Sequence, residues 1–228
     1  TGQYDKHRTM YISSVDRIVW VWQRASNTYG YIRAATPNTS TNTFDTLGTA
    51  SQVGTSTDGD DDFALAYDIA DSRIICVYRD DYQNYSKGRP FELNTSTNAL
   101  TGGGSVEIPK KPATGGSGFH AAFPCGVYDT QNNNSVFVFR DNDNTGIVTS
   151  VQAYMNSNTL TWSSTTTPLG GSANCMATAC VADTTSNKGY FAIDTSNSGT
   201  NIVAIYSRNP DSSAPLSGSN ARWNLARS

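Results

Sequence analysis

A repeated pattern of two short strands is the feature of this sequence that most restricts its fold. The clearest copy spans residues 62–80, where a strand of small residues ends at Tyr67-Asp68, a polar turn follows, and an apolar strand ends at Arg79-Asp80. A near copy spans residues 121–141 and ends in the same Arg-Asp pair. Internal repeats of this kind are typical of chains built from tandem supersecondary units.

Two weaker copies, at residues 10–24 and 179–194, complete a series of four. One residue near the end of the first strand is taken as equivalent in every copy: Tyr11, Tyr67, Tyr128 and Ala182. These residues are 56, 61 and 54 positions apart, so four units fill the 228 residues. We therefore expect a single repeat-built domain with units at 1–57, 58–113, 114–170 and 171–228.

The composition favours strands over helices. Ser and Thr together number 54 and Asn 20, whereas the helix-favouring residues Glu and Lys number 2 and 5. Each unit has room for four short strands, and in the first unit the second, third and fourth cover residues 18–22, 29–35 and 43–47. Units of four antiparallel strands predict an all-β fold, with a small β-propeller preferred and a β-sandwich or a β-solenoid as the alternative.

The second strand of each unit predicts the core. Residues 18–22 read Ile-Val-Trp-Val-Trp and are apolar on both faces, as expected for a strand covered from two sides. We expect the large side chains of these strands to be mostly buried: Trp20, Trp22, Cys76, Tyr78, Phe137, Phe139 and Phe191.

The charge and hydropathy patterns exclude two classes of partner. The net charge is -3 and Lys110-Lys111 is the only adjacent basic pair, so no nucleic-acid site is expected. No apolar run approaches the roughly 18 residues that a membrane span needs, and the first residues lack a signal-peptide core. We expect a soluble chain that does not insert into membranes.

The four cysteines are not spaced as a metal site, because no Cys-x-x-Cys pair occurs. Cys76 lies inside an apolar strand, which favours a buried free thiol. The alternative is a disulfide between Cys125 and either Cys175 or Cys180.

The two clear repeats resemble a known sequence pattern. Tyr67-Asp68 with Arg79-Asp80, and Tyr128-Asp129 with Arg140-Asp141, are similar to the tandem "YD…VVVAYRD…N..G" repeats. These repeats occur in tail and virion-surface proteins of bacteriophages and large aquatic viruses, and in some secreted microbial proteins. The resemblance implies a propeller-like attachment or assembly protein at a virion surface or in an extracellular structure. It brings no catalytic residue with it.

One loop has the alternating oxygen ligands of a calcium site. Asp141, Asp143 and Asn144 are its candidate metal ligands, although no acidic residue completes the loop. Solvated turns are the simpler explanation, since Asp and Asn side chains bond to nearby backbone in turns. We therefore expect no cofactor, with calcium as the alternative.

Glycoside hydrolysis would need two carboxylates at the axis of a propeller. Asp68, Asp129 and Asp183 recur at the ends of first strands, near such an axis. Their recurrence argues against catalysis, because a catalytic acid and base need different environments, whereas a repeated residue is usually a turn former. His7 and His120 lie in unrelated contexts. We expect no enzyme activity.

Aromatic residues outside the predicted core suggest contacts with a partner or a glycan. A tyrosine side chain combines an apolar ring with a hydroxyl group that forms hydrogen bonds, which suits contact with a protein partner and with a glycan. The candidate binding residues are Tyr29, Tyr82, Tyr85 and Tyr154.

Together these patterns predict a non-enzymatic surface, attachment or assembly protein of a virus particle or another extracellular structure. A glycan-binding lectin is the first alternative and a propeller glycoside hydrolase the second. The expected partners are other virion or extracellular proteins and cell-surface glycans, and a homo-oligomer is compatible with the pattern.

Overall fold

The computed structural model describes residues 4–24, 28–54, 63–80, 85–109, 121–130, 133–141, 147–163, 167–168, 174–183, 188–197, 200–207 and 221–224. From residue 174 on, side chains are described only at Cys180 and Val181. The expected unit boundaries near residues 57, 113 and 170 lie outside the described residues.

Within these residues, antiparallel strands form four sheets that follow the chain. Sheet 1 contains β1 (Tyr4–Ile12), β2 (Arg17–Arg24), β3 (Tyr29–Asn38), β4 (Thr43–Leu47) and β5 (Ser51–Gly54). Sheet 2 contains β6 (Ala64–Asp68), β7 (Arg73–Asp80), β8 (Tyr85–Asn94), β9 (Ala99–Gly102) and β10 (Val106–Glu107). Sheet 3 contains β11 (Ala121–Asp129), β12 (Asn134–Asp141), β13 (Ile147–Asn156), β14 (Thr159–Trp162) and β15 (Thr167–Pro168). Sheet 4 contains β16 (Asn174–Asp183), β17 (Lys188–Asn197), β18 (Thr200–Ser207) and β19 (Ala221–Asn224).

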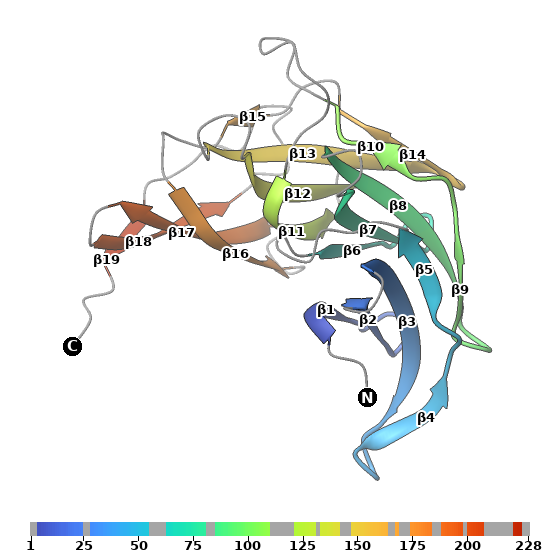
Figure 1. Ribbon diagram of the computed structural model, residues 1–228. Helices are drawn as coiled ribbons and strands as arrows, with labels where there is room; N and C mark the ends of the chain where they lie inside the picture. Colours follow the sequence, from blue (N-terminus) through green and yellow to red (C-terminus); the bar gives the residue numbers. More distant parts are fainter. Residues whose placement is uncertain are drawn as a thin grey trace.

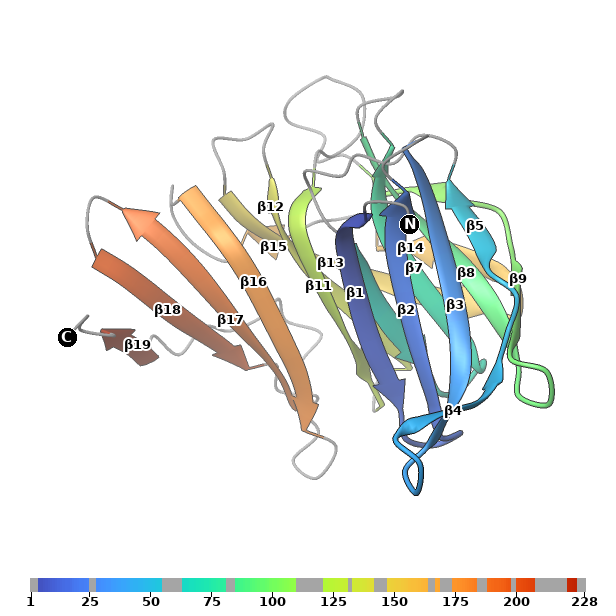
Figure 2. The same ribbon diagram turned by 60° about the horizontal axis from the view of Figure 1, so that its bottom comes forward.

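The sheets are arranged as the blades of a propeller. Figure 1 shows them one after another around a central region, with β1, β6, β11 and β16 innermost. These inner strands contact one another in chain order, β1 with β6, β6 with β11, and β11 with β16. Figure 2 shows the long strands of each sheet running side by side. The predicted all-β architecture of repeated four-stranded antiparallel sheets is therefore confirmed.

Strand pairing repeats from sheet to sheet at the predicted positions. Tyr11 pairs with Ile18, Tyr67 with Ile74, Tyr128 with Ser135, and Ala182 with Gly189. The residue before each second strand of sheets 1 to 3 has a left-handed backbone: Asp16, Ser72 and Asn133, with φ of 52°, 53° and 47°. The turns after the first strands of sheets 1 to 3 thus share one geometry. The strand pairing gives Tyr11, Tyr67, Tyr128 and Ala182 equivalent places in their sheets.

The outer edge of the sheets contains a repeat that the sequence patterns above did not include. Residues 38–42 and 94–98 are both Asn-Thr-Ser-Thr-Asn, and they lie 56 positions apart. The first Asn closes each turn with its side chain, because Asn38 Oδ1 accepts from Ser40 N at 3.0 Å and Asn94 Oδ1 accepts from Ser96 N at 3.0 Å. Comparing the sequence with itself would have revealed this pair.

Short final strands in sheets 1 to 3 are a second feature beyond the prediction. β5, β10 and β15 continue the fourth strand after a break and pair with the third strand. In sheets 1 and 2 an arginine side chain bonds into the break: Arg33 Nε donates to Gly48 O at 2.5 Å, and Arg89 Nε donates to Gly103 O at 2.9 Å. The broken strand is therefore held by side-chain bonds as well as by the ladder.

Neighbouring sheets are joined by repeated bonds from an arginine to an asparagine. Arg17, at the start of β2, donates from Nε to Oδ1 of Asn98 in sheet 2 at 2.5 Å. Arg73, at the start of β7, donates from Nε and Nη2 to Oδ1 of Asn158 in sheet 3, at 3.0 and 2.6 Å. Each bond fixes the second strand of one sheet to the outer turn of the next.

The core lies between the sheets, and most of the residues predicted to form it are buried there. Cys76, Tyr78, Phe137 and Phe139 are at most 3% exposed, which confirms their prediction. Trp20 and Trp22 are less deeply buried than these four, with intermediate exposure. Among the described residues, no neighbouring sheet packs on their face of sheet 1 in the way that the equivalent faces of sheets 2 and 3 are packed. The side chain of Phe191 lies outside the described residues.

Of the cysteines whose side chains the structure describes, none is in a disulfide bond. Cys76 and Cys125 are buried, and Cys180 is partly buried with its Sγ donating to Gly126 O at 3.2 Å. This confirms the free thiol of Cys76, and it leaves Cys125 and Cys180 unlinked. The side chain of Cys175 lies outside the described residues. The described part of the chain has no helix long and apolar enough to cross a membrane.

Candidate functional site

The inner strands line a half-open cavity of about 650 Å³ at the centre of the array. Residues of β1, β6 and β11 line it, and Cys180 and Val181 of β16 complete its described wall. We call this space the axial cavity. Small side chains on the inner strands, such as Ala64, Ala66 and Gly126, leave the room for it. Its volume is within the roughly 300 to 1,000 Å³ of typical ligand sites.

The wall of the axial cavity combines aromatic rings with groups that form hydrogen bonds. The three equivalent tyrosines Tyr11, Tyr67 and Tyr128 all contribute to it. Thr9 and Arg8 of β1 add a hydroxyl and a guanidinium, and the turn after β1 adds the hydroxyls of Ser13 and Ser14. Tyr11 is 58% exposed, so its ring is available to a ligand.

Two of these tyrosines lie beside carboxylates of the inner turns. Tyr11 OH donates to Asp16 Oδ1 at 3.0 Å, and this bond raises the pKa of Tyr11. Burial, and then the charge of Asp68, raises the pKa of Tyr128 to about 12. Both phenols therefore stay protonated at neutral pH and are able to donate a hydrogen bond.

Among the described residues that line the axial cavity, none is Asp or Glu. Asp68, at the end of β6, is 1% exposed, and its Oδ1 accepts from Ala70 N at 3.0 Å and Asp71 N at 3.1 Å. Burial raises the pKa of Asp68, and its Oδ2 has no hydrogen-bond partner. The bonds of Asp68 are those of a turn former. Asp129 ends β11 in the equivalent position, and the side chain of Asp183 lies outside the described residues.

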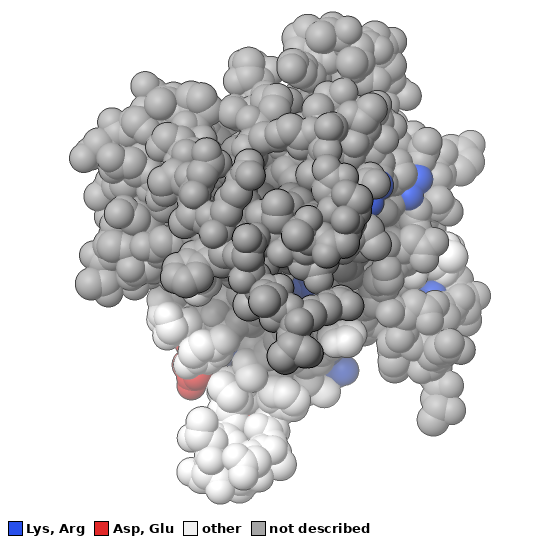
Figure 3. Space-filling model, turned by 90° about the vertical axis from the view of Figure 1, so that its left-hand side faces the viewer, with Lys and Arg blue, Asp and Glu red and all other residues white. Residues whose placement is uncertain are grey.

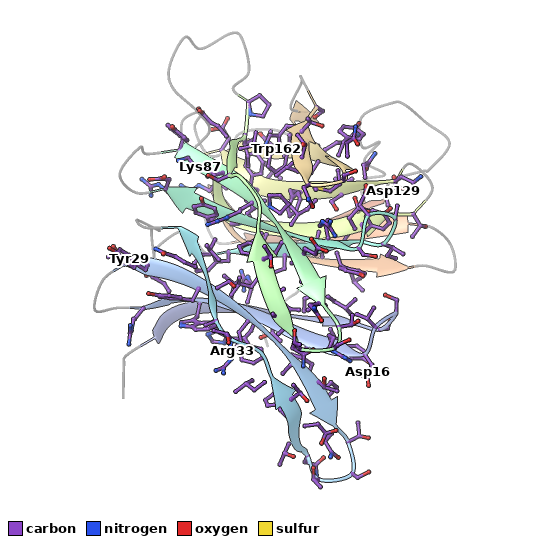
Figure 4. All side chains as sticks on the ribbon, turned by 90° about the vertical axis from the view of Figure 1, so that its right-hand side faces the viewer. Asp16, Tyr29, Arg33, Lys87, Asp129 and Trp162 are labelled. Carbon is purple, nitrogen blue, oxygen red and sulfur yellow. The ribbon has the colours of Figure 1, made fainter. Side chains whose placement is uncertain are left out.

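The candidate binding tyrosines lie away from the axial cavity and in two different places. Tyr29 and Tyr85 are the first residues of β3 and β8, at equivalent ends of neighbouring sheets, and Lys87 Nζ lies 5.1 Å from the ring centre of Tyr85. Figure 4 shows Tyr29 at one end of sheet 1 and Asp16 at the other. Tyr154 lies near the last residue of β13, at the end of sheet 3 that corresponds to the Asp16 end. The structure therefore does not bring these three together, and Tyr82 lies outside the described residues.

The candidate calcium ligands are only partly described. Asp141 is 4% exposed at the end of β12, where it pairs with Ala121 and Ile147. Asp143 and Asn144 lie outside the described residues, so the calcium alternative stays a prediction. Of the two histidines, His7 is exposed on β1 and His120 lies outside the described residues.

No protein-family model matches this chain, and no curated protein matches it either. Four chains of solved structures match it. One is an exo-β-1,3-galactanase from Phanerochaete chrysosporium, crystallised as a variant with β-1,3-galactotriose. The TM-score is 0.55 at 11% identity, and the match covers 100% of this chain and 51% of the galactanase.

This chain therefore spans about half the length of that enzyme. At this identity the likeness is one of fold alone. It agrees with the sheet topology in defining a β-propeller fold. No viral relative supports the repeat resemblance.

Proposed function

We propose that this chain is a non-catalytic propeller that binds a short oligosaccharide in its axial cavity. The observation that carries the proposal is the chemistry of the cavity wall: three tyrosines, several hydroxyls and one arginine, without a carboxylate among the described residues. Aromatic faces and well-placed hydrogen-bond donors are what a sugar needs from a binding site. Binding without turnover also suits an attachment protein on a virion or in an extracellular structure.

Hydrolysis is the competing function, because the galactanase shares the fold. Glycoside hydrolysis ordinarily uses two carboxylates about 5 to 9.5 Å apart on either side of the bond to be broken. Asp68 is the carboxylate next to the cavity tyrosine Tyr128, and its Oδ1 is occupied by two backbone N–H groups. Among the described residues of the cavity wall no second carboxylate stands beside it, so the pair that hydrolysis ordinarily uses is not found there.

The first probe is β-1,3-galactotriose, the sugar named with the galactanase, followed by a glycan array. Titration calorimetry should give saturable binding. Tyr11→Ala should weaken it about tenfold, which corresponds to about 1.4 kcal/mol for one lost aromatic contact. Tyr154→Ala is the matched control, because this exposed tyrosine lies outside the cavity, and it should bind like the parent.

Two results would contradict the proposal. One is the absence of binding to every glycan tested, or binding that Tyr11→Ala leaves unchanged. The other is release of shorter sugars on long incubation, detected by chromatography and abolished by Asp68→Asn, which would establish a hydrolase instead.

A further inference from the structure

Arg8 is the one charged residue among the described residues that line the axial cavity. The whole chain has 19 acidic and 16 basic residues, so the described wall of the cavity differs from the molecule as a whole in the sign of its charge. Salt screens a partly buried charge less than an exposed one. The half-buried Arg8 is therefore the feature of the wall that should discriminate most strongly among sugars.

A hydrogen bond holds the guanidinium of Arg8 in place. Arg8 Nε donates to the main-chain oxygen of Phe63 at 3.2 Å, which ties β1 to the residue before β6. A guanidinium has five N–H donors, and this bond uses one of them. Ala64 and Ala66 line the same cavity on the side of sheet 2, where their small side chains leave space. A planar donor group fixed beside such a space is suited to a carboxylate, which it binds with two parallel hydrogen bonds.

Negative charge lies toward the other end of the inner strands. Asp16 is in the turn after β1, where its Oδ1 accepts from Tyr11 OH at 3.0 Å, and Asp68 ends β6. Tyr11 is three residues from Arg8, which is about 10 Å along an extended strand. A ligand with one carboxylate would therefore be oriented, with its acid group at Arg8 and a neutral sugar ring at Tyr11.

The other described residues of the wall do not repel an anion. Tyr11 and Tyr128 stay protonated at neutral pH, because the bond to Asp16 raises the pKa of Tyr11 and burial raises the pKa of Tyr128 to about 12. Together with Thr9 they give the wall neutral hydroxyls that are able to donate. On the side of the molecule drawn in Figure 3, the described residues show basic atoms in more places than acidic ones. Charge on that side does not oppose the approach of an anion.

We propose that the axial cavity takes an acidic oligosaccharide, and that Arg8 binds the carboxylate of a uronic acid unit. This inference rests on the proposed function, since it names the class of sugar for the same cavity. A hydrogen-bonded pair of charges ordinarily changes an affinity by about tenfold or more. Neutral oligosaccharides are weaker ligands, because they offer the guanidinium no negative charge.

The test compares two sugars that differ by one carboxylate. One is β-1,3-galactotriose, and the other is the same trisaccharide with its terminal unit oxidised at C6 to a uronic acid. Titration calorimetry should show at least about tenfold tighter binding of the acid. This preference should shrink as the NaCl concentration rises from about 0.01 to about 1 M. Arg8→Gln should bring the two affinities to within about twofold of each other.

Arg24→Gln is the matched control, because it removes the same charge from an exposed residue at the end of β2, outside the described wall. It should keep the preference for the acid. Tyr11→Ala should weaken both trisaccharides by a similar factor, since its ring would contact a sugar ring and not the carboxylate. If Arg8→Gln does not fold, Arg8→Lys serves as the second variant. It keeps the charge without the planar donor group and should lower the preference to about threefold.

Equal binding of the two trisaccharides by the parent would overturn the inference and leave the proposed function standing. A preference that both Arg8 variants leave unchanged would also overturn it, because the acid would then be bound elsewhere. Hits confined to neutral sugars on a glycan array would have the same meaning. The absence of binding to these trisaccharides and to every glycan of the array, acidic ones included, would overturn the inference together with the proposed function.

Discussion

Replacing Phe137 by alanine should lower the free energy of unfolding by about 3 to 5 kcal/mol. The ring is 0% exposed and meets Trp162 edge to face, with the ring centres 5.9 Å apart and the planes at 71°. Its other side lies against the backbone of β11, because a Cβ built on Gly126 would come within 2.4 Å of Phe137 Cε1. Strand backbones cannot move far into the space left by the ring, so the loss should fall in the upper part of this range.

Urea unfolding at 25 °C, followed by tryptophan fluorescence and circular dichroism, measures the effect. Phe44→Ala is the matched control, since this phenylalanine is 50% exposed and its truncation should cost less than about 1 kcal/mol. A loss below about 1 kcal/mol for Phe137→Ala, or equal losses for both variants, would refute the reasoning that sheets 2 and 3 bury this ring between them.

Three further substitutions test other parts of the fold. Asn98→Ala removes the acceptor of the Arg17 hydrogen bond and places an alanine at a left-handed backbone position, φ 57°. It should lower the free energy of unfolding by about 2 to 4 kcal/mol in the same titration, and a change under about 0.5 kcal/mol would count against the bond between sheets. Gly88→Ala places a Cβ 2.3 Å from Trp162 Cζ2 and should cost about 1 to 3 kcal/mol; unchanged stability would show that the ring moves away freely. Burial raises the pKa of Asp68 in the folded state, so its contribution to the free energy of unfolding is present below the usual Asp pKa and is lost as the pH rises above about 4 through the raised value. Asp68→Asn should remove this pH dependence of the free energy of unfolding, measured between about pH 3 and 7, and an unchanged pH dependence would contradict the prediction.

Pairing within each sheet was predictable because it depends on local patterns. The turn that follows Tyr67 reappears after Tyr128, and both tyrosines pair seven residues further along the chain. A local repeat of this kind fixes strands and register without any knowledge of distant contacts.

Burial and site geometry depend on which sheet lies beside which, and sequence patterns do not contain that information. Trp20 and Phe137 occupy equivalent positions in equally apolar strands, yet Phe137 is fully buried and Trp20 only partly. Tyr29 and Tyr154 both looked like surface aromatics, but only the register places them at different ends of their sheets. The cavity tyrosines were visible as part of the repeat, although nothing local marks Tyr11 as the most exposed of them.

Among the described residues, each sheet packs on the next in chain order, as in a series of units. In such a series stability is close to a sum of unit terms and nearest-neighbour terms. A substitution in sheet 1 should therefore be felt by sheets 1 and 2 and hardly by sheet 4, which leaves each unit free to acquire new surface residues. Under a pulling force on the two ends, the chain should give way one unit at a time, so that a single load is absorbed in several successive steps.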